Sequence, residues 1–239
     1  MINDPHYFLP GENGFKGQVL DDLLAKGYYR MQHMIFTTHQ TALDPEKENI
    51  PVFWLRTEVK KIQENKTALT IRKYCAPFTV TIKKAAITTE LEELYSMYKN
   101  HVDFCASTTC WDYLHLDEFE NPYDSWMIEI RDGNILIAAG FFDKGENAIS
   151  GILNFYHPAY HKFSLGKYLI LKKIDHALEN NILYYYTGYI STAITKFDYK
   201  LFPDINAIEV YLPVGNIWVP YNSLGKEKLK DHIVNNKEQ

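Results

Sequence analysis

The chain has 239 residues, of which 46% are apolar and 23% charged, and its formal net charge is −5. This length allows one large domain or two small ones with a sizeable buried core. No apolar run approaches the roughly 20 residues of a membrane-spanning helix, and three cysteines (Cys75, Cys105 and Cys110) are too few for a disulfide framework. We therefore expect a soluble, cytoplasmic protein with reduced thiols and no membrane partner.

The acidic net charge conceals one basic segment. Between Arg56 and Lys84, eight basic residues stand against two acids, so this segment carries +6 and the remainder of the chain −11. The segment is either a solvated lysine-rich face or a patch that follows a phosphodiester backbone. Because the remainder is acidic, we expect any RNA to bind locally, and we expect no binding to DNA.

Residues 1–84 are predicted to form an irregular α+β region. The sequence indicates a short helix that ends at Gly27, because glycine readily terminates helices. Two strand-like runs follow at 28–38 and 50–59, separated by a polar turn, and 78–82 is expected to be a connecting extended piece.

From Thr88 onward the predicted elements are better defined. A capping-box spacing at 89–92 precedes a helix, and the turn Asp132-Gly133-Asn134 joins two strands because glycine accepts positive φ. Ser164 is expected to cap a helix that runs to about Asn180. The other expected elements are a short helix around Trp111, strands at 126–131, 135–143, 148–156, 183–189 and 207–212, and a helix at 192–200.

This order in the second half is an antiparallel meander, a helical crossover and a strand parallel to the last meander strand. It is similar to the acyl-CoA N-acyltransferase (GNAT) fold, in which two parallel neighbours can splay and open a cleft. We therefore predict an α+β fold with a GNAT-like mixed sheet flanked by helices and a smaller N-terminal α+β region packed on it. The expected divisions are the N-terminal region 1–84, a catalytic domain 85–224 and a loose tail 225–239.

The first candidate site lies where a strand is followed by a helix. Free N–H groups and the helix dipole attract phosphate at such an N-terminus, and a glycine there lets a ligand approach the backbone. An ordinary capped helix with a packing glycine is the alternative. The residues concerned are Ser164, Leu165, Gly166, Lys167 and Tyr168.

The second candidate site is the tyrosine-rich strand that ends at Gly188 and Tyr189. A tyrosine at the end of a splayed strand can donate a hydrogen bond to a developing oxyanion, although alternation along the strand places half of these tyrosines in the core. Lys196 and Lys200 are four residues apart, hence on one face of the expected helix. They could bind a carboxylate or phosphate, or be solvated.

No Cys/His spacing makes a convincing zinc site, and the sequence has no P-loop, nucleophile elbow or His-Glu-x-x-His motif. We expect no metal and no cofactor.

Collinear segments over most of the chain resemble the arginyl-tRNA–protein transferases, specifically bacterial relatives that transfer leucine to protein N-termini beginning with Asp or Glu. The matching segments are Phe8-Leu9-Pro10-Gly11, Gly27-Tyr28-Tyr29-Arg30, Glu129-Ile130-Arg131-Asp132-Gly133, Ser164-Leu165-Gly166-Lys167-Tyr168 and Tyr186-Thr187-Gly188-Tyr189 with Lys196, Tyr199 and Lys200.

The resemblance implies a GNAT-like enzyme that uses aminoacyl-tRNA and a protein or peptide with an acidic N-terminus. The substrate's α-amine would attack the aminoacyl ester and the tRNA 3′ hydroxyl would leave, without a covalent enzyme intermediate. Tyr189 would orient the ester or oxyanion, and Lys196 and Lys200 would hold tRNA phosphate or the acidic side chain. Arg30, Arg131 and His157 are further cleft candidates, and the basic segment would seat the acceptor arm of the tRNA.

Some positions depart from the family pattern. His6 stands at the first of the places where the family carries N-terminal cysteines, and residues 39–42 lack the others. A metal-regulated N-terminal site is therefore not expected. His157-Pro158 replaces the family's Asp-Pro. An acyl-CoA-dependent N-acyltransferase and a non-catalytic GNAT-like module that binds acidic N-termini remain the alternative functions.

Overall fold

The computed structural model describes residues 7–42, 48–102, 106–116 and 121–235, so His6 and Cys105 lie outside the described residues. Its larger sheet is formed by β4 (Gln40–Thr41), β5 (Ile50–Glu58), β6 (Thr79–Lys84), β7 (Ser125–Asp132), β8 (Ile135–Lys144), β9 (Ala148–Tyr156), β10 (Tyr184–Ser191), β11 (Ile208–Leu212) and β12 (Ile217–Pro220). Eight strands follow the order β12-β11-β5-β10-β9-β8-β7-β6, and β4 pairs with β5. Strands β9 and β10 are parallel, and the other neighbours are antiparallel.

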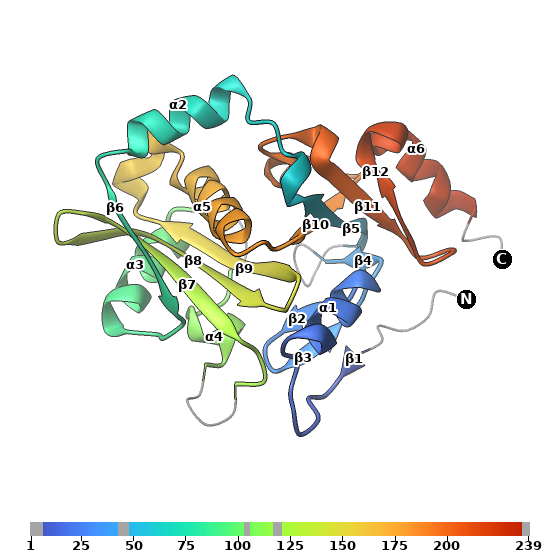
Figure 1. Ribbon diagram of the computed structural model, residues 1–239, viewed down its shortest axis with the longest axis horizontal. Coiled ribbons are helices and arrows are strands. Elements are labelled where there is room, and N and C mark those ends of the chain that lie inside the picture. The colour runs from blue at the N-terminus through green and yellow to red at the C-terminus, as the bar shows by residue number, and fades with distance from the viewer. Residues whose placement is uncertain (1–6, 43–47, 103–105, 117–120, 236–239) are drawn as a thin grey trace.

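Helices cover both faces of this sheet (Figure 1). The helices α2 (Lys66–Cys75) and α5 (Leu165–Glu179) pack together on one face, and α3 (Thr89–Lys99) and α4 (Trp111–Leu114) lie on the other. Because side chains alternate along a strand, Met127 packs on the side of α3 and its neighbour Ile128 on the side of α5. Burial on both faces accounts for the nearly continuous apolar run of β8.

A second sheet of three short strands lies beside β5 and β10 (Figure 1). Its order is β1-β3-β2, formed by β1 (Tyr7–Phe8), β2 (Tyr29–Met31) and β3 (Met34–Phe36), with α1 (Gln18–Ala25) packed nearby. The expectation of one strand over 28–38 is wrong, because the chain reverses at Gln32 with a φ of 57° and forms a hairpin. Leu24 and Ile35 are buried in one cluster with Trp54 and Tyr186, which joins the two sheets.

A buried ion pair also joins the two sheets. The Arg30 guanidinium donates to Asp143 Oδ1 and Ser125 Oγ, each at 2.8 Å, and lies 4.4 Å from the centre of the Tyr123 ring. Both charged side chains are 1% exposed. Burial raises the pKa of Asp143, while Arg30 and Ser125 oppose that shift.

The second half of the chain agrees with most of the expected elements. The hairpin of β7 and β8 turns at Gly133, whose φ is 57°, and α3 begins with the Thr88 side chain accepting a hydrogen bond from Leu91 N. The side-chain cap expected at Ser164 is wrong. Ser164 has left-handed φ and ψ and its side chain makes no cap hydrogen bond.

Several elements differ from expectation. The piece at 78–82 belongs to β6, the edge strand of the larger sheet, and the helix α2 before it was not predicted. The expected helix at 192–200 is wrong, since only a short 3₁₀ turn forms, η3 (Asp198–Leu201). The other 3₁₀ turns are η1 (Val59–Lys61), η2 (Pro158–Phe163) and η4 (Ile205–Ala207).

The segment expected to be a loose tail is helical as far as Asn235. Helix α6 (Tyr221–Asn235) has a kink at Gly225 and buries Leu229 against the cluster that contains Leu55 and Val210. Among the described helices, none has both the length and the apolar character required to cross a bilayer.

The parallel pair of strands separates part-way along its length, as expected. Tyr184, Tyr185 and Tyr186 pair with Ala148, Ile149 and Ser150, and no pairing between β9 and β10 continues beyond these residues in the described chain. Strand β10 goes on pairing with β5, past a bulge at Thr187, while β9 goes on pairing with β8. The two strands therefore leave an opening between them.

Candidate active site

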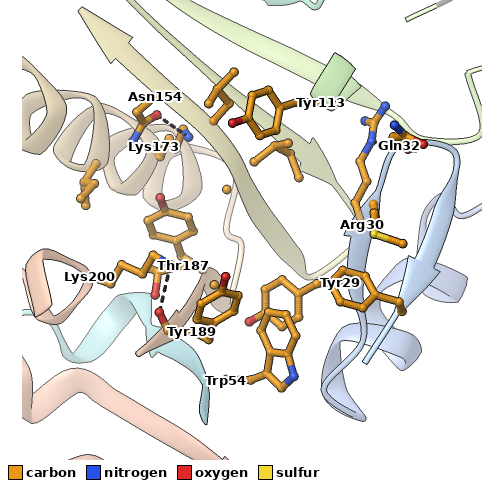
Figure 2. A pocket seen from close by; sticks show the side chains of 18 of the residues that line it. Tyr29, Arg30, Gln32, Trp54, Tyr113, Asn154, Lys173, Thr187, Tyr189 and Lys200 are labelled. Carbon is orange, nitrogen blue, oxygen red and sulfur yellow. Dashed lines mark hydrogen bonds between the residues drawn. The ribbon is translucent and has the colours of Figure 1, made fainter. Parts of the chain in front are cut away.

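A cavity of about 450 Å³ lies where β9 and β10 separate (Figure 2). Its wall combines both strands with the small sheet, α4, α5 and η3. The lining residues are Tyr29, Arg30, Met31, Gln32, Phe36, Trp54, Ser107, Asp112, Tyr113, Gly151, Ile152, Leu153, Asn154, Ile170, Lys173, Tyr185, Thr187, Gly188, Tyr189, Tyr199 and Lys200. Concave, mainly apolar sites with a few polar groups are typical of small-ligand binding.

Aromatic rings form one side of this cavity. Trp54 stacks on Tyr29 with ring centres 3.9 Å apart, and the Trp54 ring meets Tyr189 edge to face at 5.1 Å and Phe36 at 5.9 Å. This cluster fixes Tyr189, which was predicted from the sequence, in the cavity wall.

Lys200 and Gly188, both predicted from the sequence, contact each other at the cavity. The Lys200 Nζ donates to the Tyr189 carbonyl at 2.9 Å and lies 4.5 Å from the centre of the Tyr189 ring. Burial lowers the pKa of Lys200 to about 7. Gly188 has a φ of 98°, and a Cβ there would lie 3.0 Å from the Lys200 Nζ, so glycine leaves room for the ammonium.

A second lysine in the wall was not predicted. The Lys173 Nζ donates to the Phe141 carbonyl and to Asn154 Oδ1, each at 2.8 Å (Figure 2). Burial lowers the pKa of Lys173 to about 7, and the charge of Asp143 opposes the shift. The sequence carried a signal for it, because Lys173 lies four residues from Leu169 and from Ala177 on the buried face of α5.

Two polar atoms of the wall are buried without a hydrogen-bond partner among the described residues. They are Thr187 Oγ1, at the bulge of β10, and Trp54 Nε1. Such atoms are uncommon, because buried polar groups are nearly always hydrogen-bonded. The wall thus also contains two unpaired polar atoms beside the two buried lysines, Lys173 and Lys200.

Comparisons with known proteins identify the family of this chain. A family model described as "Arginine-tRNA-protein transferase, C terminus" matches residues 90–203. The Aspartate/glutamate leucyltransferase of Paracoccus denitrificans is 26% identical over 83% of this chain and 72% of its own length. The Pseudomonas putida (strain ATCC 47054) protein of the same name is 30% identical, covering 66% of each chain. The chain belongs to the arginine-tRNA-protein transferase family.

Membership of this family confirms the expected class of enzyme, an aminoacyltransferase. Among solved structures, FemX is similar with a TM-score of 0.46 and 9% identity, over 74% of this chain and 61% of that one. The assignment to the arginine-tRNA-protein transferase family rests on the sequence matches.

The helix start that resembles the family motif lies outside the cavity wall. Leu165 and Tyr168, in the first turn of α5, are buried in the core between α5 and the sheet. The Lys167 Nζ lies 5.3 Å from the centre of the Phe202 ring, and a Cβ on Gly166 would meet Tyr156 at an ordinary 3.7 Å. Ser164 precedes them in left-handed backbone. The structure thus does not bring these five residues together with Tyr189 and Lys200.

The three further cleft candidates make contacts elsewhere in the fold. Arg30 lines the cavity, but its guanidinium is held in the ion pair with Asp143. Arg131 pairs with Glu90 at 2.6 Å at the far end of β7, and the His157 side chain accepts a hydrogen bond from Ala159 N at the start of η2.

Lys196 is not part of the cavity wall. It precedes η3, so the shared helical face expected for it and Lys200 does not exist.

The basic segment spans β5, η1, α2 and β6. Five of its eight cations are paired with carboxylates, among them Lys83 and Lys84 on the edge strand β6. Lys60, Lys66 and Lys73 are exposed, and no ion pair holds them within the part of the chain that the structure describes. Among the described residues of the segment, these three lysines of η1 and α2 are the cations without an ion pair.

Neither of the two described cysteines lines the cavity. Cys75 and Cys110 are buried free thiols, and burial raises the pKa of both. In the described residues, no three His, Cys, Asp or Glu side chains are grouped so as to hold a metal ion.

Proposed function

We propose that this protein transfers leucine from charged tRNA to the α-amine of proteins with acidic N-termini, in the cavity between β9 and β10. The observation that carries the proposal is the opening of the parallel strands beside Tyr189 and Lys200, in a member of an aminoacyltransferase family. The reaction forms a C–N bond, breaks the ester C–O bond and returns a proton to the tRNA 3′ oxygen. Positioning the amine against the ester supplies much of the rate.

The composition of the wall favours leucine over arginine as the transferred residue. Asp112 is the one carboxylate among the described lining residues, and it already accepts a hydrogen bond from Thr109 N at 2.8 Å. A guanidinium enclosed here would have only this one carboxylate among the described lining residues as an anionic partner, and burying a charge that is incompletely paired is costly. The side chains of Phe36, Ile152 and Ile170 instead offer apolar contact to an aliphatic side chain.

The near-neutral lysine Lys200 supports the choice of acidic N-termini. Burial lowers the pKa of Lys200 to about 7 and so opposes its charged form. A carboxylate brought close to it would favour the charged form and raise that pKa. Binding of an Asp or Glu side chain would thus restore the charge that burial opposes, whereas a neutral side chain would not.

We also infer a GNAT-like core within 85–224, completed by the region 1–84, and a cytoplasmic location, where charged tRNA is found. The meander β7–β8–β9, the crossover helix α5 and the parallel strand β10 support this core. The N-terminal region supplies β5, the strand beside β10.

A transfer assay tests the proposed function. The purified protein is incubated with a mixture of labelled aminoacyl-tRNAs and a peptide beginning with Asp, and a peptide beginning with Asn is the matched control. We expect leucine to be incorporated into the Asp peptide and much less into the Asn peptide. Absence of transfer from every charged tRNA would refute the proposal.

The same preparation separates the alternatives. Heat on titration with acetyl-CoA would favour an acyl-CoA enzyme, and binding of the Asp peptide without turnover would favour a binding module.

A further inference from the structure

At the end of the cavity formed by α5 and β9, Lys173 and Asn154 form a hydrogen-bonded pair. The Lys173 Nζ is hydrogen-bonded to Asn154 Oδ1 and to the Phe141 carbonyl, each at 2.8 Å (Figure 2). Lys173 is 1% exposed, and within the described chain no carboxylate forms an ion pair with it. Its partners are therefore two neutral acceptors inside the fold.

The strands are shaped to accommodate this pair. The ladder of β8 and β9 shifts register, so that Phe141 pairs with Leu153 while Phe142 pairs with Gly151, and Ile152 is the extra residue of a bulge. Gly140 lies opposite Asn154, and a Cβ on Gly140 would come within 2.6 Å of Asn154 Oδ1. The missing side chain at Gly140 thus leaves space for the carboxamide oxygen.

The hydrogen bond from Lys173 determines the orientation of the Asn154 carboxamide, that is, the positions of its Oδ1 and Nδ2 atoms. An amine donates to the carboxamide oxygen of Asn154 and not to its NH₂ group, so the oxygen must face Lys173. The Asn154 Nδ2 group has no acceptor among the described residues, and Asn154 is half-buried in the cavity wall. The pair therefore leaves a hydrogen-bond donor unused beside the cavity.

We propose that Asn154 Nδ2 donates a hydrogen bond to the carbonyl oxygen of the aminoacyl ester and to the oxyanion that forms on it, and that Lys173 is the positioning residue that orients Asn154. This inference rests on the proposed function. When the α-amine attacks, the C–N bond forms and the C=O π electrons move to oxygen. They re-form the C=O bond as the ester C–O bond breaks, and the amine's proton passes to the leaving 3′ oxygen.

A donor held in place before the reaction stabilises the oxyanion without reorganisation. Loss of one such donor typically lowers kcat by about 10²- to 10³-fold.

Substitution of Asn154 tests the donor. Asn154→Asp keeps the size of the side chain and can still accept from Lys173, but an ionised carboxylate has no N–H to donate. We expect kcat for transfer to fall by about 100-fold or more, with the KM for aminoacyl-tRNA within about threefold of the unaltered protein. Asn154→Ala should give a similar loss of kcat without adding charge. The matched control is Lys172→Met, because Lys172 is the neighbouring lysine of α5 and pairs with Asp175.

A double-mutant cycle tests the positioning role of Lys173. If Lys173 acts through Asn154, then Asn154→Ala lowers kcat less in a Lys173→Met background than in the unaltered protein. Effects that multiply would instead indicate independent, structural roles. Thermal unfolding and tRNA binding of each variant identify any that misfold.

An unchanged kcat in folded Asn154→Asp or Asn154→Ala, or full multiplication in the cycle, would overturn this inference while leaving the proposed function intact. Failure of the unaltered protein to transfer from any aminoacyl-tRNA would instead overturn the proposed function.

Discussion

At the scale of single residues, Gly188 leaves the space that the Lys200 Nζ needs to reach the Tyr189 carbonyl of β10. An alanine there would have to adopt a positive φ, which residues with a side chain disfavour. Its Cβ would also lie only 3.0 Å from the Lys200 Nζ, so the ammonium would have to move. We predict that Gly188→Ala costs about 1–3 kcal/mol of unfolding free energy and raises the KM for an Asp peptide. Denaturant unfolding and transfer kinetics measure the two effects. Gly11→Ala is the control, because Gly11 has open space around it and no positive φ, and equal behaviour of the two variants would contradict the prediction.

The lowered pKa of Lys173 leads us to predict that the stability of the protein depends on pH. Its folded pKa of about 7 lies below the ordinary value of 10.5, so between these pH values the unfolded chain binds more protons than the folded chain. The free energy of unfolding should therefore rise with pH across this window, and below pH 7 the cost of burying the charge is complete. Asp143 is the other charged group that acts on Lys173, and its charge is already paired with Arg30.

Lys173→Met should remove this contribution. The stability of Lys173→Met relative to the unaltered protein is then expected to improve as pH falls from 9 to 6, when urea unfolding is followed at each pH. A difference that stays constant with pH would show that burial does not lower the pKa of Lys173.

At the scale of elements, α6 is predicted to be part of the folded core. Leu229 is fully buried against the cluster of β5 and β11, whereas its neighbour Lys228 is exposed. Removing the Leu229 side chain leaves a cavity, so Leu229→Ala should cost about 2–4 kcal/mol, measured by denaturant unfolding. Lys228→Ala is the matched control and should cost less than about 0.5 kcal/mol. Equal, small effects of both substitutions would mean that α6 is not docked.

The elements that the sequence predicted well are those whose pattern is local. The hairpin at Gly133 and the helix after Ser164 have a turn residue or an apolar periodicity that decides them without distant contacts. The helix α6 was missed because its apolar residues are few and Gly225 interrupts the pattern. The hairpin of β2 and β3 was missed because Gln32, and not a glycine, adopts the positive φ at its turn.

The candidate site could be predicted only in part for a related reason. Tyr189, Gly188 and Lys200 lie close together in the chain, so one motif indicated all three. Lys173, Asn154 and Trp54 reach the same cavity from three other elements, and their proximity depends on the register of β9 with β8 and of β5 with β10. A long-range register of this kind is set by packing of the whole sheet, which a single sequence does not display.

At the scale of the whole molecule, α2 is predicted to contact the tRNA. Lys66 and Lys73 are seven residues apart on α2, exposed, and without an ion-pair partner in the described ranges. Changing both to Gln should weaken tRNA binding and lower the slope of log affinity against log salt by about one to two. Filter binding across a salt series measures this slope. Lys83→Gln with Lys84→Gln is the control of equal charge, because these lysines of β6 are already paired with Glu129 and Asp124. Equal slopes in the two double variants would count against a contact at α2.

The ion pair of Arg30 and Asp143 is predicted to hold the small sheet against the larger one. Both groups are buried, so Arg30→Met leaves a carboxylate without its cation and should cost about 3–5 kcal/mol of unfolding free energy at neutral pH. Burial already raises the pKa of Asp143, and loss of Arg30 would raise it further.

A carboxyl whose folded pKa is raised contributes stability below its unfolded pKa and loses it as pH rises through the folded pKa. The deficit of Arg30→Met should therefore shrink as the pH is lowered from 7 toward 5, when urea unfolding is measured at each pH. Adding Asp143→Asn removes the ionisable group, so the double variant should regain part of the stability at pH 7 and lose the pH dependence. A small deficit that is the same at every pH would mean that the two sheets are held together by apolar packing around Leu24, Ile35 and Trp54 alone.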